Sequence, residues 1–124
     1  FWQKINNLEL FKNTKNNILR AVVPLSNNKK LMKYLKNKYK YYIDWSGSLF
    51  WIEVADKDEM KIKEIKKFIL EIDGYLAVIK RSENFSFHES LFTINENRLF
   101  ISKKIKESFD PKRIFNPGKM YREI

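Results

Sequence analysis

The sequence contains no cysteine, and this absence excludes several kinds of chemistry. A chain of 124 residues without cysteine has no structural disulfide, no cysteine ligands for an iron–sulfur cluster and no thiol nucleophile. Only three glycines are present, at Gly47, Gly74 and Gly118, and they are too far apart to form a glycine-rich loop for a pyrophosphate. We therefore expect a protein of a reducing compartment, the cytoplasm by default.

Long apolar runs and clustered metal ligands are also missing. No run approaches the roughly 20 apolar residues that span a bilayer, and the first seven residues lack the pattern of a signal peptide. We predict no metal site, because no His, Asp and Glu residues have ligand spacing, and no Ser, His and Asp grouping indicates nucleophilic catalysis. The chain begins with Phe1 rather than Met, and we interpret residues 1–17 as a segment that enters from an N-terminal domain.

Positive charge is abundant, with 25 Lys and Arg against 15 Asp and Glu and a net charge of +10. Such a charge attracts nucleic acid, anionic lipid or acidic partners. Lysine outnumbers arginine, however, and Asn, Ile, Phe and Tyr are also frequent, which is the joint bias of an AT-rich genome. We interpret much of the charge as codon usage, with the lysines of 29–36 and 61–67 on solvated helix faces.

Four segments have the patterns of strands. The run from Ile18 to Pro24 is apolar and rich in β-branched residues, as in a central strand, and Arg20 interrupts it. Two later segments alternate on either side of Ser46-Gly47 and predict a hairpin. Strands are expected over 18–24, 41–45, 49–54 and 75–80.

A two-residue turn at Ser46-Gly47 fixes the register of this hairpin. We expect Trp45 to pack in the core. The predicted pairs are Trp45/Ser48, Ile43/Phe50 and Tyr41/Ile52 on one face, and Asp44/Leu49, Tyr42/Trp51 and the ion pair Lys40/Glu53 on the other.

Three helices are predicted from apolar spacing and end signals. The first begins at a Ser26 N-cap and ends near Lys38. The second is capped by Asp56 or Asp58 and stops at a left-handed Gly74. Pro111 ends the third. The apolar faces comprise Leu31, Tyr34 and Leu35 in the first helix, Ile62, Ile65, Phe68, Ile69 and Ile72 in the second, and Ile94, Ile101, Ile105 and Phe109 in the third.

The order of these elements predicts an α+β fold of the ferredoxin-like βαββαβ class, with a C-terminal helix and an extended tail added. The sheet should be antiparallel, with the first two helices on one face. Its other face would be aromatic and charged, and such a face needs a cover. The residues expected there are Arg20, Tyr42, Asp44, Leu49 and Trp51.

The tail carries the most specific string, Phe109-Asp110-Pro111-Lys112-Arg113-Ile114-Phe115-Asn116-Pro117-Gly118-Lys119-Met120-Tyr121. Asp110-Pro111 breaks a helix, Asn116-Pro117-Gly118 forms a tight turn, and Ile114 and Phe115 should pack between them. The string resembles the C-terminal signature of FAD-linked oxidases of the vanillyl-alcohol-oxidase/PCMH type.

Three upstream strings favour one branch of that family. Ile43-Asp44-Trp45-Ser46-Gly47-Ser48-Leu49-Phe50-Trp51 resembles the hairpin of the FAD-binding subunit of bacterial glycolate oxidase, and Leu19 to Pro24 and Tyr75 to Arg81 are similar to two of its strands. The sequence departs from that pattern at Ser46 and Asp73, where glycine is usual, and at Lys119, where arginine is common.

The resemblance implies that residues 18–124 form the C-terminal cap, on the substrate side of an FAD-dependent oxidoreductase acting on a 2-hydroxy acid such as glycolate. An N-terminal FAD-binding domain would hold the cofactor, and we do not expect FAD on this fragment alone, which should be inactive by itself. The implied partners are that domain, the small-molecule 2-hydroxy acid and other oxidase subunits, including an iron–sulfur subunit, but no nucleic acid. The location would be cytoplasmic, peripheral to the inner membrane through partner subunits.

Oxidation of a 2-hydroxy acid by flavin needs a cation for the substrate carboxylate and a base for the hydroxyl proton. Arg20 is the candidate catalytic residue because it interrupts an apolar strand; the alternative is an ion pair with Asp44. His88 is the one histidine, and no sequence spacing indicates a residue that would orient its imidazole as a base. We interpret it as a surface residue. The substrate-side face comprises Tyr42, Asp44, Trp51 and Arg81, and Arg81 is interpreted as a solvated charge at the rim of this face. The resemblance assigns cofactor binding to Asn116, Gly118 and Lys119.

Two functions of other classes remain open. A ferredoxin-like sheet with aromatic residues could be an RNA-binding platform of the RRM type, although residues 48–54 lack the glycine–aromatic pattern and carry Glu53. A domain that only pairs subunits would instead present a flat apolar face.

Overall fold

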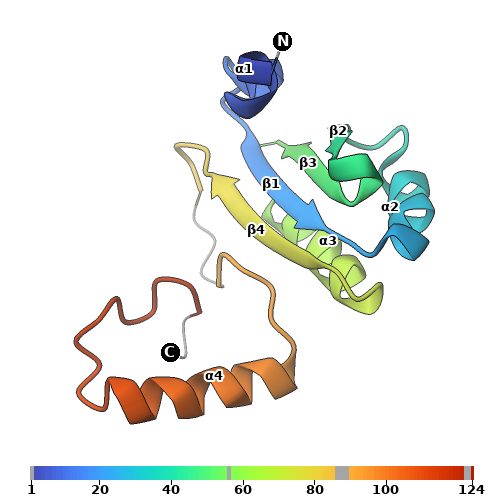
Figure 1. Ribbon diagram of the computed structural model, residues 1–124. Coiled ribbons are helices and arrows are strands. Elements are labelled where there is room, and N and C mark those ends of the chain that lie inside the picture. Colours follow the sequence, from blue (N-terminus) through green and yellow to red (C-terminus); the bar gives the residue numbers. More distant parts are fainter. Residues whose placement is uncertain (1, 56, 86–89, 122–123) are drawn as a thin grey trace.

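A four-stranded antiparallel sheet with two helices against one face forms the centre of the molecule (Figure 1). The computed structural model describes residues 2–55, 57–85, 90–121 and 124. The strand order is β2-β3-β1-β4, and the chain runs β1, α2, β2, β3, α3, β4 through it, which confirms the predicted ferredoxin-like α+β fold. The bounds are β1 Asn17–Val22, α2 Asn28–Leu35, β2 Lys40–Asp44, β3 Leu49–Val54, α3 Glu59–Glu71 and β4 Tyr75–Lys80.

The core lies between the sheet and the two helices. Leu19 pairs with Ile52 and Ala21 with Phe50, and all four side chains are fully buried. Alternate residues of a strand point to opposite faces, so this register sends one apolar set to the helices. The helices contribute Leu31, Leu35, Ile62, Ile65 and Ile69, each with no exposed surface.

The predicted starts and stops of the helices need two corrections. Ser26 is not an N-cap, because it lies in a 3-10 turn, Leu25–Asn27, and α2 begins at Asn28. Gly74 is not the left-handed residue that ends α3, because Asp73 has that conformation, with φ of 57°. A Cβ on Gly74 would lie 2.8 Å from Val23 Cγ1 and 2.9 Å from Ile69 Cγ2, so the glycine permits close packing instead. Asp58 is the residue before α3, and Asp56, the alternative cap, lies outside the described residues.

Residues before β1 form two short helices, α1 (Trp2–Asn6) and the 3-10 turn η1 (Glu9–Phe11). Phe11 is only 3% exposed, and its ring stacks on Tyr42 at 5.8 Å between centroids. The segment predicted to enter from another domain therefore packs against the sheet.

The helix α4 (Glu96–Phe109) and the tail lie beyond the edge strand β4 (Figure 1). Residues 91–93 run along β4, where the Val78 N–H donates to the Leu91 carbonyl at 2.9 Å and the Thr93 N–H to the Leu76 carbonyl at 2.8 Å. The guanidinium of Arg98 lies 4.6 Å from the ring centroid of Tyr75. None of the α4 residues is buried, so its predicted apolar face is exposed.

No helix within the described ranges combines the length and the apolar character that crossing a membrane requires.

Candidate functional site

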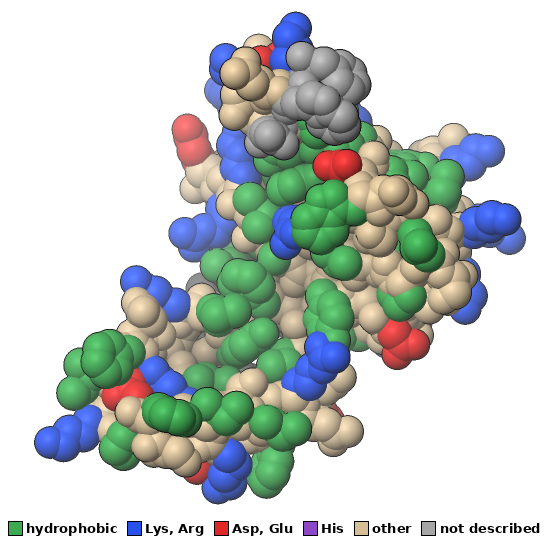
Figure 2. Space-filling model, viewed as in Figure 1, with side chains coloured by type: hydrophobic (Ala, Val, Ile, Leu, Met, Phe, Trp, Pro, Cys, Tyr) green, Lys and Arg blue, Asp and Glu red, His purple; other side chains and the backbone are tan. Residues whose placement is uncertain are grey.

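The candidate site is the open sheet face, the side of the sheet turned away from α2 and α3. Figure 2 looks onto this side and shows hydrophobic side chains continuing from the sheet toward α4. All five hairpin pairs from Lys40/Glu53 to Asp44/Leu49 have the predicted register. The open sheet face comprises Ile18, Arg20, Val22, Tyr42, Asp44, Leu49, Trp51 and Glu53.

Arg20 lies in the middle of this face, paired with Trp51 on one neighbouring strand and Ala77 on the other. Its guanidinium lies 5.1 Å from the ring centroid of Trp45. No carboxylate among the described residues forms an ion pair with it. The alternative pair with Asp44 is not made, and the Asp44 carboxylate instead accepts the Trp45 N–H at 2.8 Å. The cation therefore keeps its hydrogen-bond donors for another partner.

The turn below Arg20 has an unusual backbone. Trp45, Ser46 and Gly47 have φ of 49°, 53° and 101°, all in the left-handed region. Such a conformation costs a bulky residue on the order of 1–3 kcal/mol and marks candidate functional positions. It turns Trp45 outward, so the expectation that Trp45 packs in the core is wrong, since 56% of it is exposed. The Asp44 carboxylate stabilises the turn and thereby holds the indole under Arg20.

An aromatic row crosses the open sheet face. Tyr42 stacks on Phe11 at 5.8 Å and on Trp51 at 6.2 Å, with interplanar angles of 23° and 22°. Burial, together with the nearby Asp44 carboxylate, raises the pKa of Tyr42 above its usual value. Its phenol is therefore a neutral hydrogen-bond donor at neutral pH.

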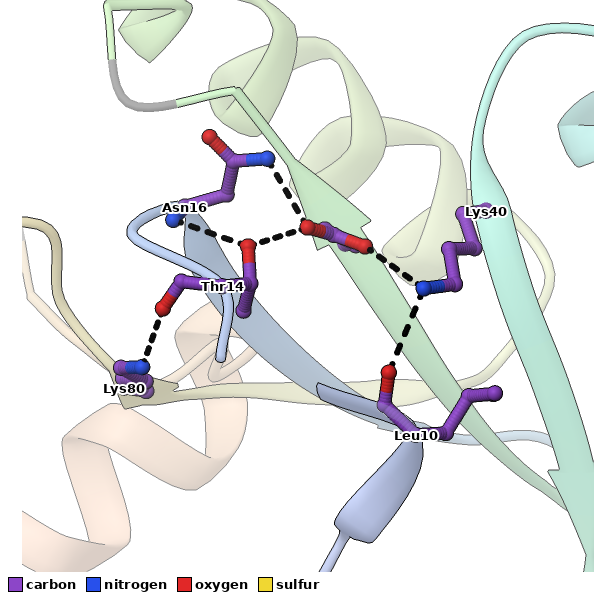
Figure 3. A network of polar contacts seen from close by, with 6 residues as sticks. Leu10, Thr14, Asn16, Lys40 and Lys80 are labelled. Atoms are coloured by element: carbon purple, nitrogen blue, oxygen red, sulfur yellow. Dashed lines mark hydrogen bonds and ion pairs between the residues drawn. The ribbon is translucent and has the colours of Figure 1, made fainter. Parts of the chain in front are cut away.

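A polar network around Glu53 ties the N-terminal segment to the same face (Figure 3). The Glu53 carboxylate accepts hydrogen bonds from the Thr14 hydroxyl and, at 2.8 Å, from the Asn16 amide, and it pairs with Lys40 at 3.6 Å. Lys40 also donates to the Leu10 carbonyl, and Lys80 to the Thr14 carbonyl. Burial alone would raise the pKa of Glu53, but the hydrogen bonds from Thr14 and Asn16 and the charge of Lys40 lower it. Residues 10–16 thus cover one end of the face.

Two sequence candidates do not join Arg20. Arg81 is exposed beyond the end of β4, where Lys80 pairs with Ile18, about 10 Å from Arg20 at the usual strand rise. It follows the strand at the same end of the sheet as Ile18 and Glu53, and its assignment to the substrate-side face stays a prediction. His88 lies outside the described residues.

The tail contains the three predicted cofactor residues. The turn is confirmed, because Asn116 and Gly118 have φ of 46° and 68° and the Lys119 N–H donates to the Asn116 carbonyl at 3.3 Å. The Gly118 N–H already donates to the Ile124 carbonyl at 2.6 Å, so it is not available to a cofactor. A groove of about 930 Å³ lies between the tail and α4, and its walls include Ile105, Phe109, Phe115, Asn116, Lys119 and Met120. The tail lies beside α4, away from β1 (Figure 1), so the sequence candidates form two separate groups.

Asp110 holds the start of the tail in place. Its carboxylate pairs with Lys106 at 2.6 Å and accepts the N–H groups of Ile114 and Phe115, each at 2.9 Å. The hydrogen bond from Lys106 and those two backbone donors outweigh burial and lower the pKa of Asp110 to about 2. Ile114 and Phe115 do not pack as predicted, since 67% and 68% of these side chains are exposed.

Sequence reasoning missed three contacts of the site: Phe11 on Tyr42, Trp45 under Arg20, and the hydrogen bonds from Thr14 and Asn16 to Glu53. Each contact joins side chains from two different elements of the chain. Alternation and helical spacing predict the face on which a residue lies, but not which distant side chain it meets. Comparisons of this chain with protein-family models, with curated proteins and with solved structures give no match.

Proposed function

We propose that this chain is the C-terminal, substrate-side part of an FAD-dependent oxidoreductase acting on a 2-hydroxy acid such as glycolate. The observation that carries the proposal is the environment of Arg20. A guanidinium in the middle of a largely apolar sheet face, without a carboxylate partner among the described residues, can bind a substrate carboxylate through two parallel hydrogen bonds. Trp45 orients it, and the strained turn that presents Trp45 fits a functional role.

The open sheet face supplies further groups for a small hydroxy acid. Tyr42 offers a neutral phenol, and Trp51 offers an aromatic wall beside it. Arg20 would fix the carboxylate while these two side chains limit the space around the rest of the substrate. None of the described groups is assigned as the base.

The cofactor would be held mainly by an N-terminal domain. Within the described residues Gly74 is enclosed by Val23 and Ile69, and Gly47 and Gly118 lie in separate turns, so these glycines form no pyrophosphate cradle. Bound FAD would accept the hydride from the hydroxy acid. The groove beside α4 supports a contact with that domain, because Asn116 and Lys119 place polar groups on apolar walls. We place the assembly in the cytoplasm, with other oxidase subunits linking it to the inner membrane.

The RNA-binding alternative has less support. Both neighbours of Tyr42 are aromatic side chains of the same chain, so bases would have to displace Phe11 to stack there. Glu53 also places a carboxylate on the face that a phosphate backbone would cross. A domain that only pairs subunits would have no need of an unpaired arginine above a strained tryptophan turn.

The test is steady-state kinetics of the flavoprotein encoded by the complete reading frame. Replacing Arg20 with Met should raise KM for glycolate or lactate roughly 10- to 100-fold, as expected for a lost hydrogen bond to a charged group, with flavin content unchanged. Glycolamide, which has no carboxylate, should lose no affinity in the same variant. Lys15→Met, at an exposed position, is the matched control for losing a surface cation.

Two results contradict the proposal. One is a purified full-length protein whose flavin no 2-hydroxy acid reduces. The other is a KM for glycolate that stays the same in the Arg20→Met and Lys15→Met variants.

A further inference from the structure

The solvent-facing side of α2 carries lysines and no carboxylate. From Ala21 to Ile43 the sequence has no Asp or Glu, and its six lysines are Lys29, Lys30, Lys33, Lys36, Lys38 and Lys40. Leu31 and Leu35 are fully buried and fix the opposite side of the helix against the core. Lys29, Lys33 and Lys36, spaced by four and three residues, therefore form one exposed stripe, which we call the lysine stripe.

The neighbouring helix α3 shows that codon usage alone does not explain this stripe. α3 is also rich in lysine, but Glu59, Glu64 and Glu71 alternate with its cations, and Asp58 pairs with Lys61 at 2.6 Å. Among the described residues, no hydrogen bond or ion pair is made by the side-chain ammonium groups of the lysine stripe. The same codon usage applies to both helices, yet α3 has charges of both signs and α2 has only positive charges.

Exposed apolar side chains adjoin the lysine stripe. Leu25, in the turn that leads into α2, is 59% exposed, and Met32, within the helix, is 38% exposed. Figure 1 places α2 at an edge of the molecule, and Figure 2 shows Lys and Arg side chains gathered along that edge. This edge is distinct from the open sheet face and from the groove beside α4.

We propose that the lysine stripe docks this protein on an anionic phospholipid bilayer, with Leu25 and Met32 entering the headgroup layer. Clusters of four or more lysines on or beside an amphipathic helix bind acidic lipids, and the segment that carries the lysine stripe has six. Adjoining apolar side chains add affinity. The helix lies on the surface without inserting, because Leu31 and Leu35 remain committed to the core.

The composition of the stripe favours lipid over two other anionic partners. Lysine is depleted in protein interfaces, where arginine is enriched. Specific contacts with nucleic acid also favour arginine, whose planar fork binds phosphates and guanines, and a phosphate backbone gains nothing from Leu25 or Met32. Lipid headgroups move freely in the bilayer, so flexible lysine side chains can bind them without a fixed arrangement of donors.

The test is binding of the 124-residue chain to vesicles of phosphatidylcholine, with and without phosphatidylglycerol. We expect binding only to the anionic vesicles, weakened by salt. Exchanging all three residues of the lysine stripe for Gln should lower the affinity on the order of 100-fold, at about fivefold per lysine. Leu25→Ser should lower the affinity further at high salt, where electrostatic attraction is screened.

The matched control is the triple Gln variant of Lys61, Lys63 and Lys67, which removes the same charge from α3. It should retain most of the affinity, and circular dichroism should show both triple variants folded. Equal losses in the two triple variants would mean that net charge alone acts, and would overturn the assignment to α2. Two other results would overturn the proposal. One is a wild-type chain that does not bind anionic vesicles. The other is a wild-type chain that a duplex oligonucleotide displaces from the vesicles at equal phosphate concentration.

Discussion

Ile62, Ile65 and Ile69 of α3 have no exposed surface, whereas Ile101, Ile105 and Phe109 of α4 are 56%, 55% and 85% exposed. Both sets have the spacing of one helix face. The difference lies in what each helix faces, since α3 packs on the sheet and α4 extends past its edge (Figure 1). Apolar spacing therefore predicts which side of a helix is available for burial, and a partner decides whether that side is buried.

The two regions also differ in how they are held. The sheet and its helices share a continuous apolar core, to which no described residue of α4 or the tail belongs. Arg98 lies over Tyr75, and Tyr121 meets Phe92 edge-on at 6.3 Å. An exposed apolar helix with few attachments is expected when another domain completes it, and this agrees with the proposed FAD-binding partner.

The largest predicted effect sharpens this contrast with a matched pair of phenylalanines. Phe50→Ala removes a fully buried ring from the core and should lower the free energy of unfolding by about 3–5 kcal/mol. Phe109→Ala removes a ring that is 85% exposed and should change it by less than about 0.5 kcal/mol. Urea unfolding followed by circular dichroism measures both. A comparable loss from Phe109→Ala would show that α4 already packs as part of the core.

A smaller, local effect is expected in the tail when Asp110 is protonated. Its folded-state pKa of about 2 is below the usual 3.8, so the contribution of Asp110 is fully present above about pH 4 and is lost as the pH falls through about 2. The amide resonances of Ile114 and Phe115 should shift in that window, and in Asp110→Asn they should be displaced already at neutral pH. The urea midpoint of the core should not change in this variant. If the core unfolds with the tail, the two regions are one cooperative unit.

The sheet could be predicted from sequence because its signals are local and agree with one another. Alternation on both sides of Ser46-Gly47 fixes the hairpin register, so Tyr42/Trp51 and Lys40/Glu53 follow from counting. The interruption of an apolar strand likewise identified Arg20 as a residue of the open sheet face.

The roles of Gly74, Trp45 and Phe11 could not be predicted, because they depend on contacts and backbone conformation that sequence periodicity does not show. The sequence predicts a left-handed stop at Gly74, but close packing against Val23 determines the role of this glycine, and no periodicity reveals that contact. Strand alternation predicts Trp45 on the same buried face as Ile43, yet the left-handed turn directs it outward. Phe11 was missed because it precedes the sheet by several residues and packs on it through one isolated ring.

Hydrogen exchange of α4 tests most directly whether this chain is one part of a larger flavoprotein. In the isolated chain, the amides of α4 should exchange by local opening, far faster than those of β1 and β3, which should exchange only on global unfolding. In the protein from the complete reading frame, the α4 amides should approach the protection of the sheet, because the FAD-binding domain would cover Ile101, Ile105 and Phe109. Protection of α4 equal to that of β1 in the isolated chain, or no gain in the full-length protein, would contradict the account.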